Sequence, residues 1–243
     1  MKVAGSVALV TGANRGLGRA MAAHLLERGA AKVYAAARTP SQVDLPGVEA
    51  IQLDITDPES VKAAAAIATD VSLVVNNAGI STGAAFLTDQ LEGVRREMDT
   101  LFYGTLNVSR AFAPILGANG GGGMINILSA MSWFSYNGGG GGYSAAKAAQ
   151  WSLTNSLRVE LFPQKTQVVG VLLGMADTDM VPEGWTGPLL TPAQVVTAAL
   201  DGLEAGKQEV LADDWSAYVK ASLAKDPAEF YTQDYLNGLF PAA

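Results

Sequence analysis

The stretch that decides the fold class is Val7-Ala8-Leu9-Val10-Thr11-Gly12-Ala13-Asn14-Arg15-Gly16-Leu17-Gly18. Its first four residues are aliphatic, which is typical of a buried strand, and they lead directly into a glycine-rich turn and a helical pattern. Glycines at such a junction let the backbone turn tightly and approach a pyrophosphate, and the helix N-terminus supplies free N–H donors. The spacing Gly-x-x-x-Gly-x-Gly differs from the general Gly-x-Gly-x-x-Gly of dinucleotide sites, so the turn alone also fits a purely structural role.

The rest of the chain repeats this alternation of a short apolar run and a longer helical pattern. The runs typical of buried strands lie at 7–10, 32–36, 48–53, 73–75, 124–128, 167–172 and 209–212. The helical patterns lie at 15–29, 58–68, 91–117, 143–161 and 192–205. Parallel strands need crossover connections, and strands covered on both faces are apolar throughout. We therefore predict an α/β fold, a doubly wound parallel seven-stranded sheet (Rossmann fold) in a single domain over residues 1–243, with ligands bound at the carboxyl ends of the strands.

Composition limits the chemistry that the protein can perform. The 243-residue chain is 49% hydrophobic and 16% charged, as expected of a globular domain with a large core. Its formal net charge of −7 disfavours binding to nucleic acid and to anionic membrane surfaces. It has no cysteine and one histidine, His24, which excludes thiolate chemistry and a histidine-rich metal site. We expect no metal, and a reaction that uses hydroxyls, amines, carboxylates or an organic cofactor.

The apolar runs are too short to cross a membrane. Residues 168–173, for example, fall far below the roughly 18 residues that span a bilayer. Chemistry without cysteine is compatible with a reducing compartment. We expect a soluble, cytoplasmic protein with no membrane partner and no nucleic-acid partner.

Polar motifs follow two of the predicted strands and open the next predicted helix. Asn76-Asn77-Ala78-Gly79 comes after the fourth strand, Ser129 after the fifth, and Tyr143-Ser144-Ala145-Ala146-Lys147 opens the next helix. Residues four apart share a helix face, so the Lys147 ammonium can favour the ionised form of the Tyr143 phenol and bring its pKa from near 10 toward working pH. A Tyr-x-x-x-Lys pair also occurs on solvated helix faces, but its place just past a strand end favours a general acid–base site.

Together with the glycine turn, these motifs resemble those of the short-chain dehydrogenase/reductase family. The resemblance runs from about residue 5 to residue 212, with the elements in the family's order. The resemblance implies that Tyr143 donates a proton to a substrate carbonyl oxygen, or removes one from an alcohol. Lys147 would lower the pKa of Tyr143 and hold the nicotinamide ribose, and Ser129 would hydrogen-bond the same substrate oxygen. Hydride would pass directly between the nicotinamide and the carbonyl carbon. Ser132 is the alternative to Ser129.

The end of the second strand indicates the cofactor. A carboxylate there would bind the ribose hydroxyls of NAD, but this chain has Ala35-Ala36-Ala37-Arg38. Arg38 and Arg15 can grip a 2′-phosphate, so we expect NADP(H) to be preferred over NAD(H); the alternative is a solvated Arg38 and use of both cofactors. The cofactor residues implied by the resemblance are Gly12, Asn14, Arg15, Gly16, Leu17, Gly18, Arg38, Asp54, Ile55, Asn76, Ala78, Gly79, Tyr143, Lys147, Gly174 and Thr178.

Three features depart from the family's pattern or leave alternatives open. Leu101 stands where the family has an asparagine that helps to hold a water in a proton relay from the lysine. Since leucine forms no hydrogen bond to water, we expect reduced but real activity. Leu173-Gly174 replaces the usual Pro-Gly, so the next segment loses a rigid turn. The glycine tract 138–142 is either a flexible connector or a gate.

Apolar and aromatic residues surround the expected site and suggest the substrate class. Residues 175–190 lie where family members have a substrate lid. With the segment after Ser129 they offer an apolar wall, whose alternative role is ordinary core or subunit packing. The predicted pocket residues are Met131, Trp133, Met175, Met180 and Trp185. This wall favours a hydrophobic ketone or aldehyde over a phosphorylated sugar.

The C-terminal tail, residues 213–243, is rich in aromatic residues and should be buried, either over the substrate pocket or against another subunit. The resemblance implies a homodimer or homotetramer built through the helices at 91–117 and 143–161. The leading hypothesis is an NADPH-dependent carbonyl reductase that also runs in reverse as an alcohol dehydrogenase. A catalytically weak NADP-binding regulator or redox sensor is the second hypothesis, and a structural protein is the third.

Overall fold

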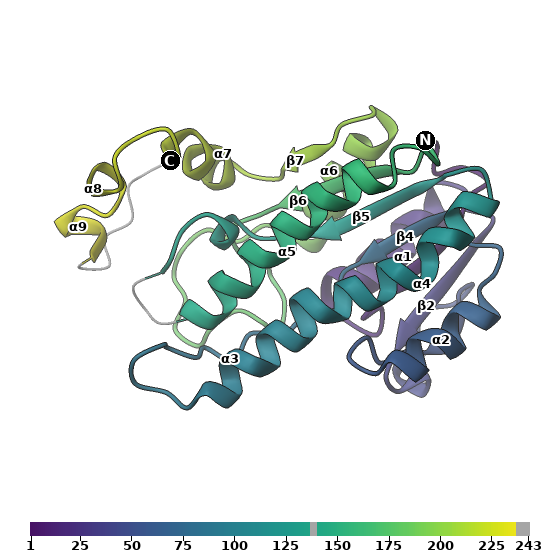
Figure 1. Ribbon diagram of the computed structural model, residues 1–243, viewed down its shortest axis with the longest axis horizontal. Coiled ribbons are helices and arrows are strands. Elements are labelled where there is room, and N and C mark those ends of the chain that lie inside the picture. The colour runs from purple at the N-terminus through teal and green to yellow at the C-terminus, as the bar shows by residue number, and fades with distance from the viewer. Residues whose placement is uncertain (137–139, 237–243) are drawn as a thin grey trace.

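The computed structural model describes residues 1–136 and 140–236, and in it seven strands form one parallel sheet (Figure 1). The strand order is β3-β2-β1-β4-β5-β6-β7, so the direction in which the chain winds reverses between β1 and β4. The strands are β1 (Val7–Thr11), β2 (Lys32–Ala37), β3 (Glu49–Gln52), β4 (Leu73–Asn76), β5 (Gly123–Ile127), β6 (Gln167–Leu172) and β7 (Glu209–Leu211). The predicted doubly wound Rossmann fold is confirmed.

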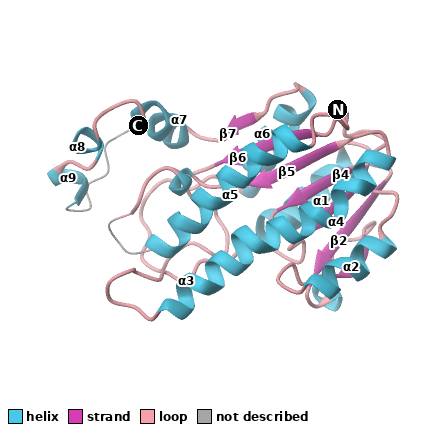
Figure 2. Ribbon diagram, viewed as in Figure 1, coloured by secondary structure: helices cyan, strands magenta, loops and turns pink. Residues whose placement is uncertain are grey.

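Helices cover both faces of the sheet (Figure 2). They are α1 (Gly16–Glu27), α2 (Pro58–Ile67), α3 (Leu91–Glu97), α4 (Thr105–Ala118), α5 (Gly141–Glu160) and α6 (Pro192–Glu204), followed by α7 (Asp214–Ser222), α8 (Pro227–Phe230) and α9 (Gln233–Leu236). Helices α1 and α6 pack together on one face, and α2, α4 and α5 lie on the other. Within the described part of the chain, no helix has the length and apolar character needed to cross a membrane.

The sheet is buried on both faces because the strands are apolar at almost every position. In β1, Val10 belongs to the core under α1 and α6, whereas its neighbour Leu9 belongs to the core under α2, α4 and α5. Met21 of α1 fills the first core and Phe112 of α4 fills the second, and both are fully buried. A strand with this pattern has no polar face to turn toward water, so it must lie inside a covered parallel sheet.

The predicted helix at 91–117 is interrupted in its hydrogen bonding. Residues between α3 and α4 form a π-helical turn, η2 (Met98–Gly104), which is continuous with both helices. Gly104 lies against Ile55, and a Cβ on Gly104 would approach the Ile55 Cδ1 to 2.6 Å. The π-helical turn is short and lies between two α-helices, and the sequence pattern predicted one uninterrupted helix over this range. Such turns are frequent at functional sites.

The described part of the C-terminal tail folds back on the segment that follows β5. The Tyr235 hydroxyl donates to the Ser135 carbonyl at 2.8 Å, and the Ser135 N–H donates to the Tyr231 hydroxyl at 3.0 Å. Phe134 packs edge-on against Trp215 of α7. Up to residue 236, the tail therefore packs its aromatic side chains against its own chain (Figure 1).

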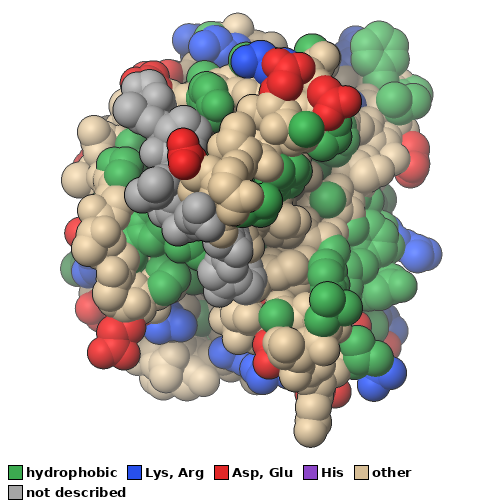
Figure 3. All heavy atoms as spheres, turned by 90° about the vertical axis from the view of Figure 1, so that its left-hand side faces the viewer, with side chains coloured by type: hydrophobic (Ala, Val, Ile, Leu, Met, Phe, Trp, Pro, Cys, Tyr) green, Lys and Arg blue, Asp and Glu red, His purple; other side chains and the backbone are tan. Residues whose placement is uncertain are grey.

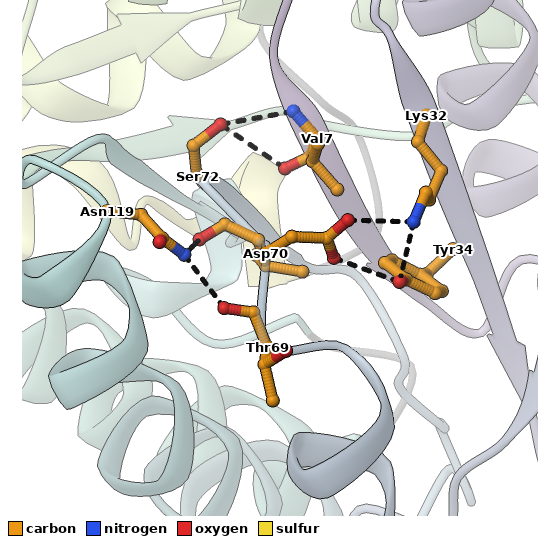
Figure 4. Close-up of polar contacts among 8 residues, drawn as sticks. Val7, Lys32, Tyr34, Thr69, Asp70, Ser72 and Asn119 are labelled. Atoms are coloured by element: carbon orange, nitrogen blue, oxygen red, sulfur yellow. Dashed lines mark hydrogen bonds and ion pairs between the residues drawn. The ribbon is translucent and has the colours of Figure 1, made fainter.

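At the amino ends of the strands, side-chain contacts connect neighbouring segments (Figure 4). Lys32, at the start of β2, forms an ion pair with Asp70 at 2.7 Å, and the Tyr34 hydroxyl donates to the same carboxylate at 2.9 Å. Nearby, the Val7 N–H donates to the Ser72 hydroxyl at 3.1 Å, and Asn119 donates to the Thr69 carbonyl at 3.0 Å. These contacts hold the amino ends of β1, β2 and β4 together, far from the edge where ligands bind.

Replacement of Phe112 by alanine tests the core under α2, α4 and α5. Because this side chain is fully buried, Phe112→Ala should lower the free energy of unfolding by about 3–5 kcal/mol, measured by urea denaturation. Leu87→Ala is the control: its side chain is 98% exposed, so the change should stay within about 0.5 kcal/mol. Equal losses in the two variants would contradict this assignment of the core.

Candidate active site

The turn after β1 has a backbone that requires glycine at three positions. Gly12 and Gly16 have φ angles of +66° and +54°, which side chains disfavour. A Cβ on Gly18 would lie 2.2 Å from the carbonyl oxygen of Gly12, so only glycine fits there. The sequence Gly-x-x-x-Gly-x-Gly therefore specifies one tight turn that brings α1 close to β1.

Asn77 holds this turn, and the sequence analysis did not assign it a role. Its side-chain amide donates to the Thr11 carbonyl at 2.9 Å and to the Gly12 carbonyl at 3.3 Å. The N–H groups of Asn77 and Ala78 both donate to the Thr11 hydroxyl at 3.0 Å. Because β1 and β4 are neighbours, the end of β4 thus fixes the shape of the glycine turn. Only the strand order, which the sequence did not give, places Asn77 here.

The N-terminus of α1 suits a pyrophosphate. The helix begins at Gly16 with no side-chain cap and no acidic residue in its first turn. Its first N–H groups therefore point out of the carboxyl edge of the sheet without a side-chain acceptor. An uncapped helix N-terminus carries partial positive charge, and the glycines let a ligand approach the backbone closely. The turn therefore fits the diphosphate of a dinucleotide.

Two arginines lie near this turn, and they differ in whether their side chains form an ion pair. Arg38 is exposed after β2 and has no hydrogen bond or ion pair with any described residue. Arg15 forms an ion pair with Asp179 at 2.8 Å, so in this structure it contacts the 175–190 segment. Both partners of that pair are 71% exposed, and surface pairs of this kind contribute little stability. Asn14 donates to Gln42 at 3.3 Å and closes the space between the turn and β2.

Several other predicted cofactor residues make structural contacts. The Asp54 carboxylate accepts hydrogen bonds from Thr56, and Ile55 is buried against Gly104. The Asn76 side chain points into the core, where its amide donates to Asn126 at 2.8 Å. The Asn76 side chain is therefore engaged within the core, and its assignment as a cofactor residue stays a prediction.

Three further predicted residues border the turn or the segment after β6. Gly79 lies under the side chain of Leu101, since a Cβ on Gly79 would be 3.0 Å from its Cδ2. Gly174 donates its N–H to Asp213 at 2.7 Å, so that carboxylate fixes the turn in which the usual proline is missing. Thr178 packs against Gly16, which brings the 175–190 segment to the glycine turn.

Ser129, Tyr143 and Lys147 come together at the carboxyl end of β5. The Ser129 hydroxyl lies near enough to the Tyr143 phenol to lower its pKa as a hydrogen-bonding neighbour, and Ser129 also accepts from the Met131 N–H at 3.1 Å. The Lys147 Nζ lies 5.7 Å from the centre of the Tyr143 ring. Ser132 is buried, and its hydroxyl has no partner among the described residues. Of the two candidate serines, the structure thus joins Ser129 to the tyrosine.

Burial dominates the electrostatics of the pair. It raises the pKa of Tyr143 to about 12, against a smaller lowering by the bond to Ser129, and the negative charge of Glu97 raises the pKa further. Burial also lowers the pKa of Lys147 to about 7. The expected acidification of Tyr143 by Lys147 is therefore absent here, because burial disfavours the ammonium itself and the effects that raise the Tyr143 pKa outweigh those that lower it.

Two buried groups near the pair carry no sequence motif. Gln150 accepts a hydrogen bond from the Lys147 Nζ at 2.9 Å, beside the bond from Nζ to the Ile127 carbonyl at 2.7 Å. Glu97 is fully buried, and one of its oxygens accepts from the Thr82 N–H and hydroxyl at 2.6 Å and 2.9 Å. The signal available in the sequence for Gln150 and Glu97 was a polar residue on a helix face that also carries apolar residues.

The predicted pocket residues divide into two groups around this site. Met131 and Trp133 follow Ser129 and pack in the aromatic cluster formed with α7 to α9. Met175 lies at the start of the 175–190 segment, whose ends are joined by a bond from the Leu190 N–H to the Met175 carbonyl at 2.9 Å.

Along that segment, Trp185 stacks edge-on near Tyr136, whereas the side chain of Met180 is 45% exposed. Figure 3 shows the face at the carboxyl ends of the strands, where hydrophobic side chains gather and most charged ones lie toward the rim. The glycine tract 138–142 lies partly outside the described residues; its last two residues begin α5.

The fold and this edge of the sheet define a dinucleotide-binding protein of the Rossmann type. The family model of short chain dehydrogenases matches residues 6–187. D-erythrulose reductase from Gallus gallus is 34% identical over 197 residues, which cover 79% of this chain and 79% of the relative. L-xylulose reductase from Bos taurus is 33% identical over 217 residues, which cover 85% and 84% of the two chains.

A solved structure extends the likeness over the whole chain. The crystal structure of a short chain dehydrogenase from Burkholderia cenocepacia J2315 in complex with NADP has a TM-score of 0.90 and 37% identity, and the match covers 100% of both chains. The chain therefore belongs to the short chain dehydrogenase family and is an NAD(P)-dependent oxidoreductase.

The low pKa of Lys147 predicts how stability depends on pH. Between pH 7 and about 10 an unfolded lysine holds a proton that the buried one has lost, so wild-type stability rises with pH relative to a Lys147→Met variant. The difference in free energy of unfolding should grow by up to about 1.4 kcal/mol per pH unit in this window and stay flat below pH 6. Urea denaturation of both proteins across this range measures it, and a flat difference throughout would contradict the low pKa.

Proposed function

We propose that the protein reduces a hydrophobic ketone or aldehyde to an alcohol with NADPH, and oxidises the alcohol in reverse. The observation that carries the proposal is the cluster of Ser129, Tyr143 and Lys147 at the carboxyl end of β5. It lies at the same edge of the sheet as the uncapped N-terminus of α1, which fits a dinucleotide diphosphate. The reductases among the relatives support the same class of reaction.

In this proposal the protein orients the reactants and moves the proton. The nicotinamide, when bound, supplies or accepts the hydride. Ser129 and Tyr143, whose hydroxyls are neighbours, both hydrogen-bond the substrate oxygen, and Tyr143 gives it a proton during reduction. Lys147 holds the nicotinamide ribose and stabilises the tyrosinate that remains.

The electrostatics of the site favour the reductive direction. Burial and the charge of Glu97 keep the Tyr143 phenol protonated at neutral pH, which is the form that a general acid needs. The oxidative direction needs the tyrosinate, so it should require higher pH or a bound cofactor that brings positive charge close to the phenol.

The proposed preference for NADP(H) depends on the end of β2. The last residue of the strand is Ala37, so no carboxylate is present there to bind ribose hydroxyls or to repel a phosphate. The exposed side chain of Arg38 follows it, without an ion pair to another described residue. Arg15 can join Arg38 at a 2′-phosphate once it releases Asp179, because that surface pair is weak.

Substitution of Arg38 tests this preference. Arg38→Ala should weaken binding of NADPH about tenfold or more and leave binding of NADH unchanged, since one charge-assisted bond is lost only with the phosphate. Fluorescence titration gives both dissociation constants. Arg19→Ala is the matched control, because Arg19 of α1 already forms an ion pair with Asp44. A wild-type preference for NADH would contradict the role of Arg38.

The proposed substrate class follows from the wall around the site. Met131 and Trp133 join the aromatic cluster of the tail, and Trp185 lies in the 175–190 segment near Tyr136. These side chains favour a bulky apolar substituent on the carbonyl carbon. The relatives named for erythrulose and xylulose make small polar ketoses the competing class.

A panel of aryl ketones, aliphatic aldehydes and ketoses, followed by absorbance of NADPH, separates the two classes. Turnover should be highest with the aryl ketones, and Tyr143→Phe should lower kcat at least about 100-fold, because general acid catalysis is lost. Tyr103→Phe, which changes an exposed tyrosine, is the control. NADPH binding without turnover of any carbonyl would favour the second hypothesis, a cofactor-binding regulator or redox sensor.

We also propose that the protein forms a homodimer or homotetramer through α4 and α5. Large apolar side chains lie exposed at the end of α5 and just after it, where Val159 and Phe162 are 75% and 79% exposed. Tyr103, just before α4, is 51% exposed. Exposed apolar side chains on neighbouring helices are typical of subunit contacts.

A further inference from the structure

Gln150 connects the lysine of the site to the π-helical turn η2. Its side chain is 1% exposed, one turn of α5 beyond Lys147. The Lys147 Nζ donates to the Gln150 Oε1 at 2.9 Å, and the Gln150 Nε2 donates to the Thr105 hydroxyl at 2.9 Å. Thr105 in turn donates to the Leu101 carbonyl at 2.7 Å. A continuous line of buried hydrogen bonds thus runs from α5 to the residue where the family's asparagine is replaced.

Lys147 needs these acceptors because it is an amine in a low-dielectric site. It is 5% exposed, and no carboxylate of the described residues forms an ion pair with it. Its two acceptors are the Ile127 carbonyl and the Gln150 amide. The first belongs to the backbone of β5 and is present whatever the side chain there. Gln150 is therefore the side chain through which this chain fixes the position of the ammonium.

We propose that Gln150 is a positioning residue for the reaction: its amide holds the Lys147 ammonium beside Tyr143 and ties it to η2, in a chain whose residue 101 is leucine. This inference rests on the proposed function of the Ser129, Tyr143 and Lys147 cluster. The leucine itself adds only its backbone carbonyl to the connection. Gln150 supplies the polar side chain that position 101 lacks.

The line of hydrogen bonds orients the lysine and does not conduct protons. Every donor in it points the same way, from Lys147 through Gln150 and Thr105 to a backbone carbonyl. An amide donates at nitrogen and accepts at oxygen, and it does not exchange a proton between the two at neutral pH. Gln150 therefore acts through the geometry and charge of Lys147.

The ionisable groups around the lysine are few. Tyr143 faces it from the same helix, and Glu97 acts on Tyr143 from the end of α3. The strands β5 and β6 and the turn after Ser129 contain no charged residue. Arg110 and Asp99 on the neighbouring helical segments are exposed. A change at residue 150 should therefore alter mainly the pKa of Lys147.

Two substitutions move the charge of Lys147 in opposite directions. Gln150→Leu removes an acceptor from the ammonium and should lower its pKa by about one unit, since a hydrogen bond to a charged group has about that effect. Gln150→Glu places a carboxylate at the same position and should raise the pKa. NMR titration of the protein labelled in lysine side chains, without cofactor, measures both shifts, with Lys147→Met to assign the signal.

Activity gives the second readout. At pH 7 a fall of one unit from a pKa of about 7 lowers the ammonium fraction about fivefold, so kcat/KM of Gln150→Leu should fall by about that factor. The alkaline limb of the pH profile should move down for Gln150→Leu and up for Gln150→Glu. Gln164→Leu is the matched control: it removes a half-buried, hydrogen-bonded glutamine near Thr166, away from the site, and should change stability alone.

The outcomes separate this inference from the proposed function. An unchanged pKa of Lys147 in both Gln150 variants, with only their melting temperatures lowered as in Gln164→Leu, would overturn the positioning role. Shifted pKa values in a protein that turns over no carbonyl would support the role of Gln150 and reject the proposed reaction. If one Gln150 variant fails to fold, the other still decides, because each predicts a shift of definite sign.

Discussion

The buried amine of Lys147 holds α5 against the end of β5, and the site depends on this contact. Its hydrogen bond to the Ile127 carbonyl fixes the position of α5 along β5. Tyr143 therefore lies beside the hydroxyl of Ser129, which is two residues after Ile127. The amine lies in a place where burial disfavours its charge. It is kept there by the hydrogen bonds that it donates to the Ile127 carbonyl of β5 and to Gln150, which is the arrangement expected where function and stability conflict.

The parallel sheet brings the rest of the site to the same edge. Because β1 and β4 are neighbours and the winding reverses between them, the glycine turn, Asn77 and the end of β5 open on one side. The amino ends of the strands are joined instead by side chains such as Lys32 and Asp70. One edge is thus closed by polar contacts, and the other retains an uncapped helix and a wall of aromatic residues.

Charges around Tyr143 distinguish this site from a simple tyrosine–lysine pair. The sequence suggested that the lysine acidifies the phenol, but burial and Glu97 act in the opposite direction. The difference arises because spacing along a helix sets which residues are neighbours, whereas burial sets how each charge is penalised. A protonated phenol beside a half-ionised amine is suited to proton donation, which accords with reductases among the relatives.

The sequence by itself determined the Rossmann class, because apolar strands without a polar face permit only a sheet covered on both sides. It also predicted the glycine turn from its local spacing, and it predicted the roles of Ser129, Tyr143 and Lys147 through the family resemblance. It did not determine the roles of Asn77, Glu97 and Gln150, or the inward direction of Asn76. Those depend on contacts between segments far apart in the chain, and only the packing of α3, α4 and α5 on the ordered strands brings such segments together.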